Sequence, residues 1–567
     1  MTIVRLGALV LIVATFASAC AGSPSGTGPV GSSAPSSAGG AKRITAGILG
    51  NPYTLSYEIN TAGTGSVRGV GEVEKIIHSG LVIRDGDGRL QPQLAEAVPT
   101  LENGKWRISP DGRMETTWVI RQGAVWHDGT PFTAGDLVFT LTEGQDKDLA
   151  LPGYPGYKSI DGIDAADDRT VTVRWIQPFI DADTLFSSEF LMPRPKHLLE
   201  QAYLNDKASY LDLPYWTVDY VGLGPFKLRE FVRDSHMVVD AFDQYVLGRP
   251  KLDTIEVRFI QDPNALIANV LAGEVQVTVG RGFNLDQIVQ VAGQWPEGRM
   301  ETSSSNWIAH YPQALTPNPP VLGEVAFRRA LLMSLDRQAM SDSLQNGQAP
   351  VAHAWLEVGD PNYAQVEPFI VKYPFDPRQA ASLIEGLGYA KGADGFYHDS
   401  SGKKLTIESR TNAGDDVKEK IVFSSADYWQ HVGVGVDTVI VPRQQASDRE
   451  YRATFPGLDL VRQPFEPERI VSSQAALPTN KFSGKNRTRY MNAELDGYVE
   501  KYLTTIPLAE RIQALGQMMH LMTDQVVALG IFYAPEPKLI SNRLPNVHAA
   551  HAPAADETWN VNQWELR

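Results

Sequence analysis

Short segments in which apolar and polar residues alternate recur through the first third of the chain, and they predict strands. Residues 43–49 (RITAGIL) alternate in this way, as do residues 114–120 and residues 167–175 (DDRTVTVRW). Short strands on either side of the Asp-Gly turn at 85–88 extend the pattern. We therefore predict a small strand-rich unit from about residue 80 to residue 180.

Helical periodicity becomes the stronger pattern further along the chain. Residues 254–260 read as a strand, residues 264–271 as a helix, and a second strand begins at Val275. This β-α-β order is the unit of a parallel sheet. From about 301 to 530, predicted helices alternate with the predicted strands KLTIESR and VDTVIVPR; the helices are FRRALLMSLDRQAMSDSL, DPRQAASLIEGLGY and DVKEKIVFSSADYWQHVG. The alternation predicts an α/β fold.

The first twenty residues have the order of a secretion signal. Arg5 precedes an apolar stretch over residues 6–16, and small residues at 17–19 lead to Cys20, the only cysteine in the chain. The stretch is shorter than the ~20 apolar residues of a membrane-spanning helix, so we predict a signal peptide over residues 1–19. Cys20 is then expected to be acylated and to begin the mature protein. The alternative is an accidental thiol, and a disulfide within one chain is excluded.

The segment that follows the cysteine, up to residue 41, consists almost wholly of Gly, Ser, Pro and Ala. Such a composition cannot bury a core, so we expect residues 20–41 to be a lipidated cysteine and a flexible tether. The order of signal, lipid, tether and large folded body predicts an extracytoplasmic lipoprotein anchored to the outer face of the cell membrane.

Length, charge and motif content narrow the function. The chain has 567 residues, more than one hydrophobic core normally serves, so two or more lobes are expected. Its net charge of -15 disfavours nucleic-acid binding, since phosphate contacts need clustered Lys and Arg. The sequence holds no G-x-S-x-G, H-E-x-x-H or C-x-x-C motif, and its 11 histidines are scattered. We therefore expect a binding protein, not an enzyme, with no catalytic residue, metal or cofactor.

Several collinear stretches carry a family resemblance. The strongest are GLVIRDGDGRLQPQLAEAV with WVIRQGAVWHDGTPFTAGDLVFTL, then VGLGPFKLREF, LGRPKLDTIEVRFIQDPNALIANVLAGEVQV and FRRALLMSLDRQAM. Weaker matches continue at GVGVDTVIV and NRTRYMNAELDGYV. Over nearly all of residues 42–567 the chain thus resembles extracellular solute-binding protein family 5, the group of dipeptide, oligopeptide and nickel receptors.

The resemblance implies a two-lobed periplasmic-binding-protein fold of type II, cluster C, with an extra strand-rich domain inserted into the first lobe. In this fold His127 and Asp128 belong to a structural turn of the inserted domain and not to an acid/base pair. The implied division gives lobe I residues 42–79, 181–300 and 530–567, the inserted domain residues 80–180, and lobe II residues 301–529.

The resemblance further implies the substrate-binding lipoprotein of an ABC importer, which captures a peptide or peptide-like solute by closure of two lobes. The expected partners are this small-molecule ligand, the ABC permease subunits and the membrane through the lipid anchor. We expect a monomer that binds no nucleic acid. Two alternatives remain open: the same scaffold holding a metal chelate, glycan or lipid-linked molecule, or a non-transport lipoprotein acting through protein contacts. A hydrolase ranks last.

The resemblance also points to candidate ligand-binding residues at the end of a second-lobe strand. Peptide-binding members hold the ligand α-amino group with an acidic residue there, and alignment on Glu466 and the following proline puts Gln463 in its place. A neutral amide cannot form that charge-assisted bond, so Glu466 or Glu468 substitutes for it or the ligand lacks the amine. Arg462 is placed to hold a ligand carboxylate. Its alternative is an ion pair with Asp459 or Glu466.

Four aromatic and acidic positions complete the predicted ligand-binding set. Trp307 and Tyr311 lie near the expected crossing between the lobes and are candidate pocket aromatics. Tyr57 and Glu58 lie in a predicted loop of the first lobe. They join the three strand-end residues Arg462, Gln463 and Glu466.

Overall fold

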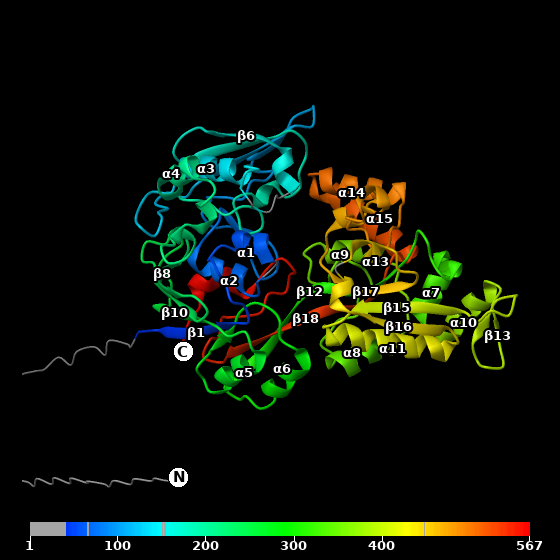
Figure 1. Cartoon of the computed structure of the whole chain (residues 1–567). Coiled ribbons are helices and arrows are strands. Elements are labelled where there is room, and N and C mark those ends of the chain that lie inside the picture. The colour runs from blue at the N-terminus through cyan, green and yellow to red at the C-terminus, as the bar shows by residue number, and fades with distance from the viewer. Residues whose placement is uncertain (1–40, 65–66, 150, 152–154, 447) are drawn as a thin grey trace, which may run out of the picture. The chain divides into compact units, whose positions relative to one another are not determined.

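Two halves of the chain share one ten-stranded mixed sheet (Figure 1). The computed structural model describes residues 41–64, 67–149, 151, 155–446 and 448–567. The predicted signal peptide, Cys20 and nearly all of the predicted tether lie outside these residues. In spatial order the strands are β16 (Gly435–Val441), β15 (Thr406–Asn412), β17 (Leu458–Gln463), β12 (Gly298–Pro312), β18 (Leu529–Ser541), β11 (Val277–Thr278), β1 (Arg43–Ile48), β10 (Thr254–Phe259), β9 (His236–Ala241) and β8 (Phe226–Val232).

The two longest strands, β12 and β18, join the halves of this sheet. They pair antiparallel along most of their length, with register shifts after Ser304 and after Ile308. The end of β18 pairs with β11, whereas β12 pairs on its other edge with β17 from Trp307 onward. The backbone therefore crosses between the halves twice, and the predicted domain boundaries at 300 and 530 fall inside the crossing strands.

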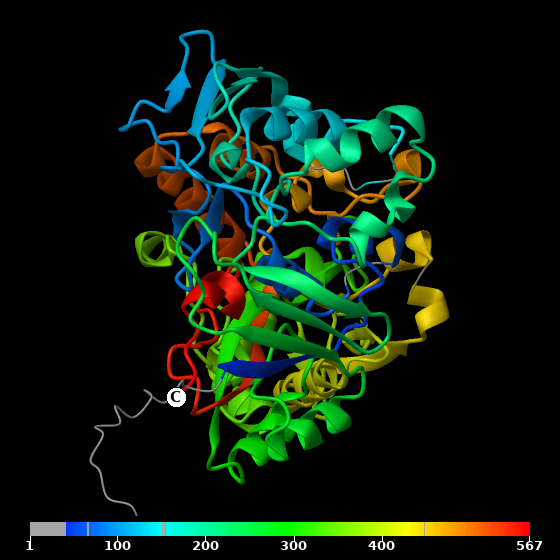
Figure 2. The same cartoon turned by 90° about the vertical axis from the view of Figure 1, so that its left-hand side faces the viewer.

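The N-terminal lobe is built on β1 and its neighbours, seen from the side in Figure 2 with β1 in dark blue. β10 and β11 both pair in parallel with β1, and α5 (Pro263–Leu271) connects them, which confirms the predicted β-α-β order. α2 (Val70–Ile77) covers one face of the sheet, while α5 and α6 (Leu285–Ala292) cover the other. Asp262 caps α5 by accepting a hydrogen bond from the Ala265 N–H.

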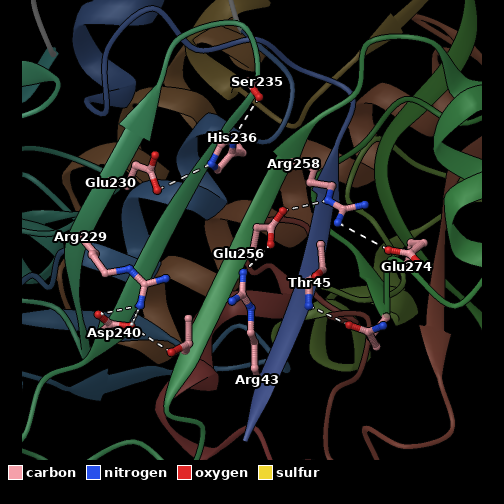
Figure 3. Close-up of polar contacts among 12 residues, drawn as sticks. Arg43, Thr45, Arg229, Glu230, Ser235, His236, Asp240, Glu256, Arg258 and Glu274 are labelled. Atoms are coloured by element: carbon pink, nitrogen blue, oxygen red, sulfur yellow. Dashed lines mark hydrogen bonds and ion pairs between the residues drawn. The ribbon is translucent and has the colours of Figure 1, made fainter. Parts of the chain in front are cut away.

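Matched charges lie across neighbouring strands on the outer part of this lobe (Figure 3). Arg43 on β1 pairs with Glu256 on β10 at 2.6 Å, and Arg229 on β8 pairs with Asp240 on β9 at 2.9 Å. The Arg and Asp side chains of these pairs are largely exposed. Cross-strand pairs of this kind stabilise an exposed sheet only slightly. We therefore interpret this surface as a solvent-exposed structural part of the lobe.

The predicted strand-rich unit contains its own antiparallel sheet, and α3 (Ala134–Gly144) packs beside it. The Thr133 N–H donates to Asp136 at 2.8 Å, which confirms the predicted capping box. His127 is buried, and its ring nitrogens bond the backbone of Gly222 and Gly224. Burial lowers the pKa of His127 to about 4, so it is a neutral structural link. The strands of this unit are β4 (Trp106–Ile108), β5 (Met114–Val119), β7 (Thr170–Trp175) and β6 (Ile160–Ala165), beside the hairpin β2 (Val82–Arg84) and β3 (Leu90–Pro92).

The second lobe packs helices on both faces of its part of the sheet. On one face the buried His310 of β12 bonds Ser425 of α11 at 3.0 Å. On the other face α14 and α15 pack on β12 and β17. Among the described residues, no helix has both the length and the apolar character that a membrane crossing requires. The remaining elements are α1 (Tyr57–Thr64), α4 (Lys196–Asn205), α7 (Val325–Met333), α8 (Arg337–Gln345), α9 (Tyr363–Val366), α10 (Pro377–Gly386), β13 (Ala390–Lys391), β14 (Tyr397–His398), α11 (Asp416–Val432), α12 (Arg443–Ala446), α13 (Arg449–Ala453), α14 (Ala493–Thr504) and α15 (Leu508–Asp524).

Candidate functional site

Three adjoining cavities lie along the boundary between the lobes: the two larger are lined by the N-terminal part of the chain and the second lobe, and the smallest by the N-terminal part, the crossing strands and residues 553–557. Their volumes are about 630, 470 and 280 Å³. The two larger cavities share Ile180, Asp181, Glu468 and Leu503 in their walls, and Glu189 lines both the largest and the smallest. Together the three are termed the interlobe cleft.

The largest cavity has apolar walls and an acidic rim. Phe179, Ile180 and Phe190 come from the segment that follows the inserted sheet, and Val471 and Leu503 come from the second lobe. Apolar walls with a few placed charges are what pockets for small organic ligands usually offer. The carboxylates that share this cavity are Asp181, Glu189, Glu468, Asp496 and Glu500.

The middle cavity adds further acidic groups. Arg84 and Arg511 line it, but Arg84 is already paired with Glu189 at 2.9 Å. Loss of water contact, and then the Asp181 carboxylate nearby, raise the pKa of Asp183 to about 7. Carboxylates outnumber cations in both larger cavities, so a cationic group on a ligand would relieve their mutual repulsion.

The smallest cavity lies beside α2 and contains two ion pairs. Lys538 of β18 pairs with Glu557 at 3.1 Å, and Lys75 of α2 pairs with Asp556 at 2.5 Å. Tyr57 lines this cavity. Of the two predicted first-lobe residues, the structure therefore brings Tyr57 to the cleft. Contact between Tyr57 and a ligand stays a prediction.

Arg462 lies at the end of β17, beside the crossing strands. Its guanidinium lies 3.3 Å from Glu536 on β18 and 3.8 Å from Asp415, which caps α11. The side chain is 31% exposed. Because Glu536 also lines the smallest cavity, Arg462 stands next to the cleft and remains reachable by a ligand.

The two acids expected as alternative partners of Arg462 are held by other arginines. Asp459 lies 3.1 Å from Arg487. Glu466 accepts two hydrogen bonds from Arg469, one of them at 2.6 Å. The predicted pairing of Arg462 with Asp459 or Glu466 is therefore wrong, because each acid is already engaged.

Gln463 is buried outside the three cleft cavities, whereas the nearby acids Glu466 and Glu468 line them. Gln463 is 6% exposed, and its side-chain oxygen has no hydrogen-bond partner among the described residues. Glu466 lines the middle cavity, where Arg469 holds it. Glu468 lines both larger cavities, and burial raises the pKa of its carboxyl. Of the two predicted substitutes for the amine-binding acid, Glu468 is the one that faces the larger part of the cleft.

Trp307 and Tyr311 lie in the core of the second lobe, at 3% and 2% exposure, and line none of the three cleft cavities. The indole Nε1 of Trp307 donates to the Tyr311 hydroxyl at 2.9 Å, and its ring stacks on Trp355. Trp355 in turn donates to the carbonyl of Pro464 at 3.0 Å. This aromatic group supports the segment that leads to Glu468, while its direct contact with a ligand stays a prediction.

Glu58 belongs to a buried ion cluster outside the cavities described above. Arg194, at 2% exposure, lies 2.5 Å from Glu58 and 3.3 Å from Glu143. Burial raises the pKa of Glu143 to about 7 against the attraction of Arg194, and it also raises the pKa of Glu58. Tyr57 and Glu58 lie in the helix α1, so the predicted loop at this position is wrong. Arg194 links Glu58 of α1 to Glu143 of α3, which is a structural role. A ligand-binding role for Glu58 stays a prediction.

Sequence reasoning missed most of the residues that line the cleft. Asp181, Asp183 and Glu189 follow the inserted sheet, and Arg511 comes from α15. The only sequence signal is a local group of acids at 181–189, a pattern that is equally typical of an exposed loop. In the part of the chain that the structure describes, no three His, Cys, Asp or Glu side chains are grouped as a metal site.

Comparison with known proteins identifies a family and several relatives that are similar to this chain. Residues 89–461 match the family described as bacterial extracellular solute-binding proteins, family 5 Middle. The oligopeptide-binding protein AppA of Bacillus subtilis (strain 168) is 25% identical over 515 residues, which are 87% of this chain and 86% of the relative.

Two solved structures share the fold. The oligopeptide binding protein from Thermus thermophilus complexed with pentapeptide has a TM-score of 0.64 at 20% identity, covering 92% of this chain and 96% of that one. NikZ from Campylobacter jejuni in complex with Ni(L-His) has a TM-score of 0.68 at 19% identity, covering 92% and 99%. The predicted fold, two-lobed and mixed α/β, is thereby confirmed. With the family match extending over most of its length, the chain belongs to family 5 of the bacterial extracellular solute-binding proteins.

Proposed function

We propose that this chain is the substrate-binding lipoprotein of an ABC importer and that it captures a peptide or peptide-like solute in the interlobe cleft. Its relatives are substrate-binding proteins of ABC transporters and not enzymes. The observation that carries the proposal is the pair of larger cavities in the cleft, which have apolar wall residues from both lobes and an excess of carboxylates. Acylation of Cys20 would hold the protein at the outer face of the membrane, with the permease as its partner.

Capture depends on contacts from both sides of the cleft. Phe179 and Ile180 line the largest cavity from one side, and Val471 and Leu503 line it from the other. A solute that touches both walls favours the arrangement in which they lie close, since a ligand shifts an equilibrium by its difference in affinity for the two states.

Glu468 is the group that best suits the α-ammonium of a peptide. It lies at the junction of the two larger cavities, and burial raises the pKa of its carboxyl. An ammonium at this point would restore the favoured charged form of the carboxylate and gain a charge-assisted hydrogen bond. The side chains of the peptide would then occupy the apolar walls of the largest cavity.

The test is a thermal-shift titration of the purified protein with pooled short peptides. A ligand that binds only the folded state stabilises it by about 2.7 kcal/mol at one hundred times Kd, so active pools should raise Tm with concentration. Leu503→Gln, in the wall of both larger cavities, should weaken the response, whereas Leu204→Gln on the exposed face of α4 should not. Silence from every pool, or an undiminished response in Leu503→Gln, would refute peptide capture in this cleft.

A metal chelate is the second candidate ligand. It is favoured by one observation, the neutral Gln463 where peptide binders of the family carry an acid. The similar fold of NikZ, solved in complex with Ni(L-His), supports the same reading. Nickel with L-histidine therefore belongs in the titration, and a rise in Tm with this mixture but with no peptide would replace the peptide by a chelate.

A further inference from the structure

A fourth cavity, of about 240 Å³, lies within the second lobe beside the cleft. It is bounded by the end of β17, by α13, by Arg469 and by the segment 482–487. It is smaller than each cavity of the cleft, so its size suits one chemical group and not a whole peptide. It is termed the basic pocket because six cationic side chains line it: Arg449, Arg452, Arg462, Arg469, Lys485 and Arg487.

The positive charge of the basic pocket is only partly neutralised. Three of its cations have acidic partners, namely Glu536 for Arg462, Glu466 for Arg469 and Asp459 for Arg487. For Arg449, Arg452 and Lys485, no ion pair occurs within the described residues, and no described carboxylate lines the cavity.

Arg452 lies among like charges in the pocket. Burial, followed by the charges of Arg487 and Arg449, lowers the pKa of this guanidinium. Burial is the largest cause, and the nearby guanidinium groups of Arg487 and Arg449 act in the same direction because like charges lie close together in this cavity. A bound anion would act in the opposite direction.

Two polar groups in the same pocket lack partners. The side-chain oxygen of Gln463 and the Nε of Arg462 are both buried and have no hydrogen-bond partner among the described residues. Gln463 is 6% exposed. Buried polar groups are nearly always hydrogen-bonded in folded proteins. The unpaired Nε–H of Arg462 is a donor and therefore points to a missing acceptor, such as an anion, whereas the Gln463 oxygen is an acceptor and calls for a donor instead.

The basic pocket adjoins the cleft through two ion pairs. Arg469 lines the pocket, and Glu466, to which it donates, lines the middle cavity. Arg462 reaches from the pocket toward Glu536, which lines the smallest cavity. A solute in the cleft would therefore need to displace only a side-chain contact to place a terminal group in the pocket.

We propose that the basic pocket receives a multiply charged oxyanion of the bound solute, such as a phosphate or a pair of carboxylates. One carboxylate requires a single arginine fork, whereas three unmatched cations call for more than one negative charge. The proposal rests on the proposed function, because it assumes that the solute lies in the cleft. It adds that the preferred solute is zwitterionic, with its cation among the cleft carboxylates and its anion in the basic pocket.

Calorimetric titration of the purified protein with two matched peptide pairs tests this. The first pair is alanyl-alanyl-glutamate and alanyl-alanyl-glutamine, and the second replaces the last residue by phosphoserine or serine. The more charged peptide of at least one pair should bind ten or more times tighter, and the pair with the larger ratio identifies carboxylate or phosphate as the group. Equal affinities within both pairs would overturn the proposal and leave peptide capture intact.

Arg452→Gln should remove most of this preference while the glutamine and serine peptides bind as before. The matched control is Arg378→Gln, an exposed residue of α10 away from the pocket, which should keep the preference. Lys485→Gln, on the exposed rim, provides a second variant if Arg452→Gln does not fold. A preference that is unchanged in the folded pocket variants would overturn the assignment.

A fragment titration separates failure of the pocket from failure of peptide capture. Citrate and inorganic phosphate, compared with sodium chloride at equal ionic strength, should raise the Tm of the wild type more than that of Arg452→Gln. If no peptide binds but this difference is found, the basic pocket stands and the proposed ligand class falls. If neither peptides nor fragments respond, both are wrong.

Discussion

Replacement of Arg194 by methionine tests whether Glu58 is structural or ligand-binding. Methionine keeps much of the length of the side chain and removes its charge. Glu58 and Glu143 then stay buried without the cation that lies 2.5 and 3.3 Å from them. Removing one partner from a buried ion pair costs about 3–5 kcal/mol of stability at neutral pH, and we expect a loss of this size.

The pH dependence of the loss follows from the pKa of Glu143. Burial raises it from 4.5 to about 7 in the folded wild type. The stability that this carboxyl contributes is fully present below pH 4.5 and is lost as pH rises through 7, at up to about 1.4 kcal/mol per pH unit. Without Arg194, both Glu58 and Glu143 titrate still higher. Arg194→Met should therefore lose least stability near pH 5, which is below the pKa of about 7 for Glu143, and most near pH 7.5.

Urea unfolding followed by tryptophan fluorescence at the two pH values measures this difference. The loss at pH 5 should be smaller by about 2 kcal/mol or more, and Arg194→Met with Glu143→Gln should recover part of the loss at pH 7.5. Equal losses at both pH values would refute the electrostatic argument. A decrease in peptide affinity of more than about twofold in the folded variant, where each twofold is about 0.4 kcal/mol, would return Glu58 to the binding site.

Three further predictions concern the amine site, the core and the anchor. Glu468→Gln should weaken a peptide with a free α-amino group by about 10- to 100-fold, because a hydrogen bond to a charged group contributes about 1.5–3 kcal/mol; calorimetry should find its N-acetylated form unaffected, and equal losses for both forms would exclude this role. Trp307→Ala should cost about 3–5 kcal/mol in urea unfolding, since the indole is buried; an unchanged stability would place Trp307 outside the core. Cys20→Ser should abolish labelling by an alkyne fatty acid and release the protein from the membrane fraction, because each buried CH₂ of an acyl chain contributes about 0.8 kcal/mol; membrane retention of the variant would contradict acylation.

The fold was predictable where its signals are local. The strand at 43–49, the β-α-β order near Asp262 and the capping box at Thr133 all depend on residues close in sequence, and the structure contains each of them. The predicted family is confirmed by the match over residues 89–461. The crossing strand β12 was not predicted, because its middle reads TSSSN at 302–306 and such residues are typical of loops. Pairing with β18, more than 200 positions away, makes it a strand.

The candidate site was less predictable, because its partners are distant in sequence. Alternation puts Trp307 and Tyr311 on the same face of a strand, but only the packing of α14 and α15 shows that this face is covered. The sequence predicts that Glu58 lies in a ligand pocket, because its actual partner Arg194 is 136 positions further along the chain and local patterns do not reveal that contact. Arg462 was placed beside the cleft, but the acids around it belong to other elements than those expected.

Both connections between the lobes in the sheet are strands of that sheet, paired with each other. Two loosely linked bodies would move in many directions, but two strands joined by a hydrogen-bonded ladder bend as one plate and resist sliding. The register shifts after Ser304 and Ile308 interrupt that ladder and concentrate its flexibility there. We therefore expect relative movement of the lobes to consist mainly of bending at these two points, which would couple the spacing of the cleft walls at one end to their spacing at the other.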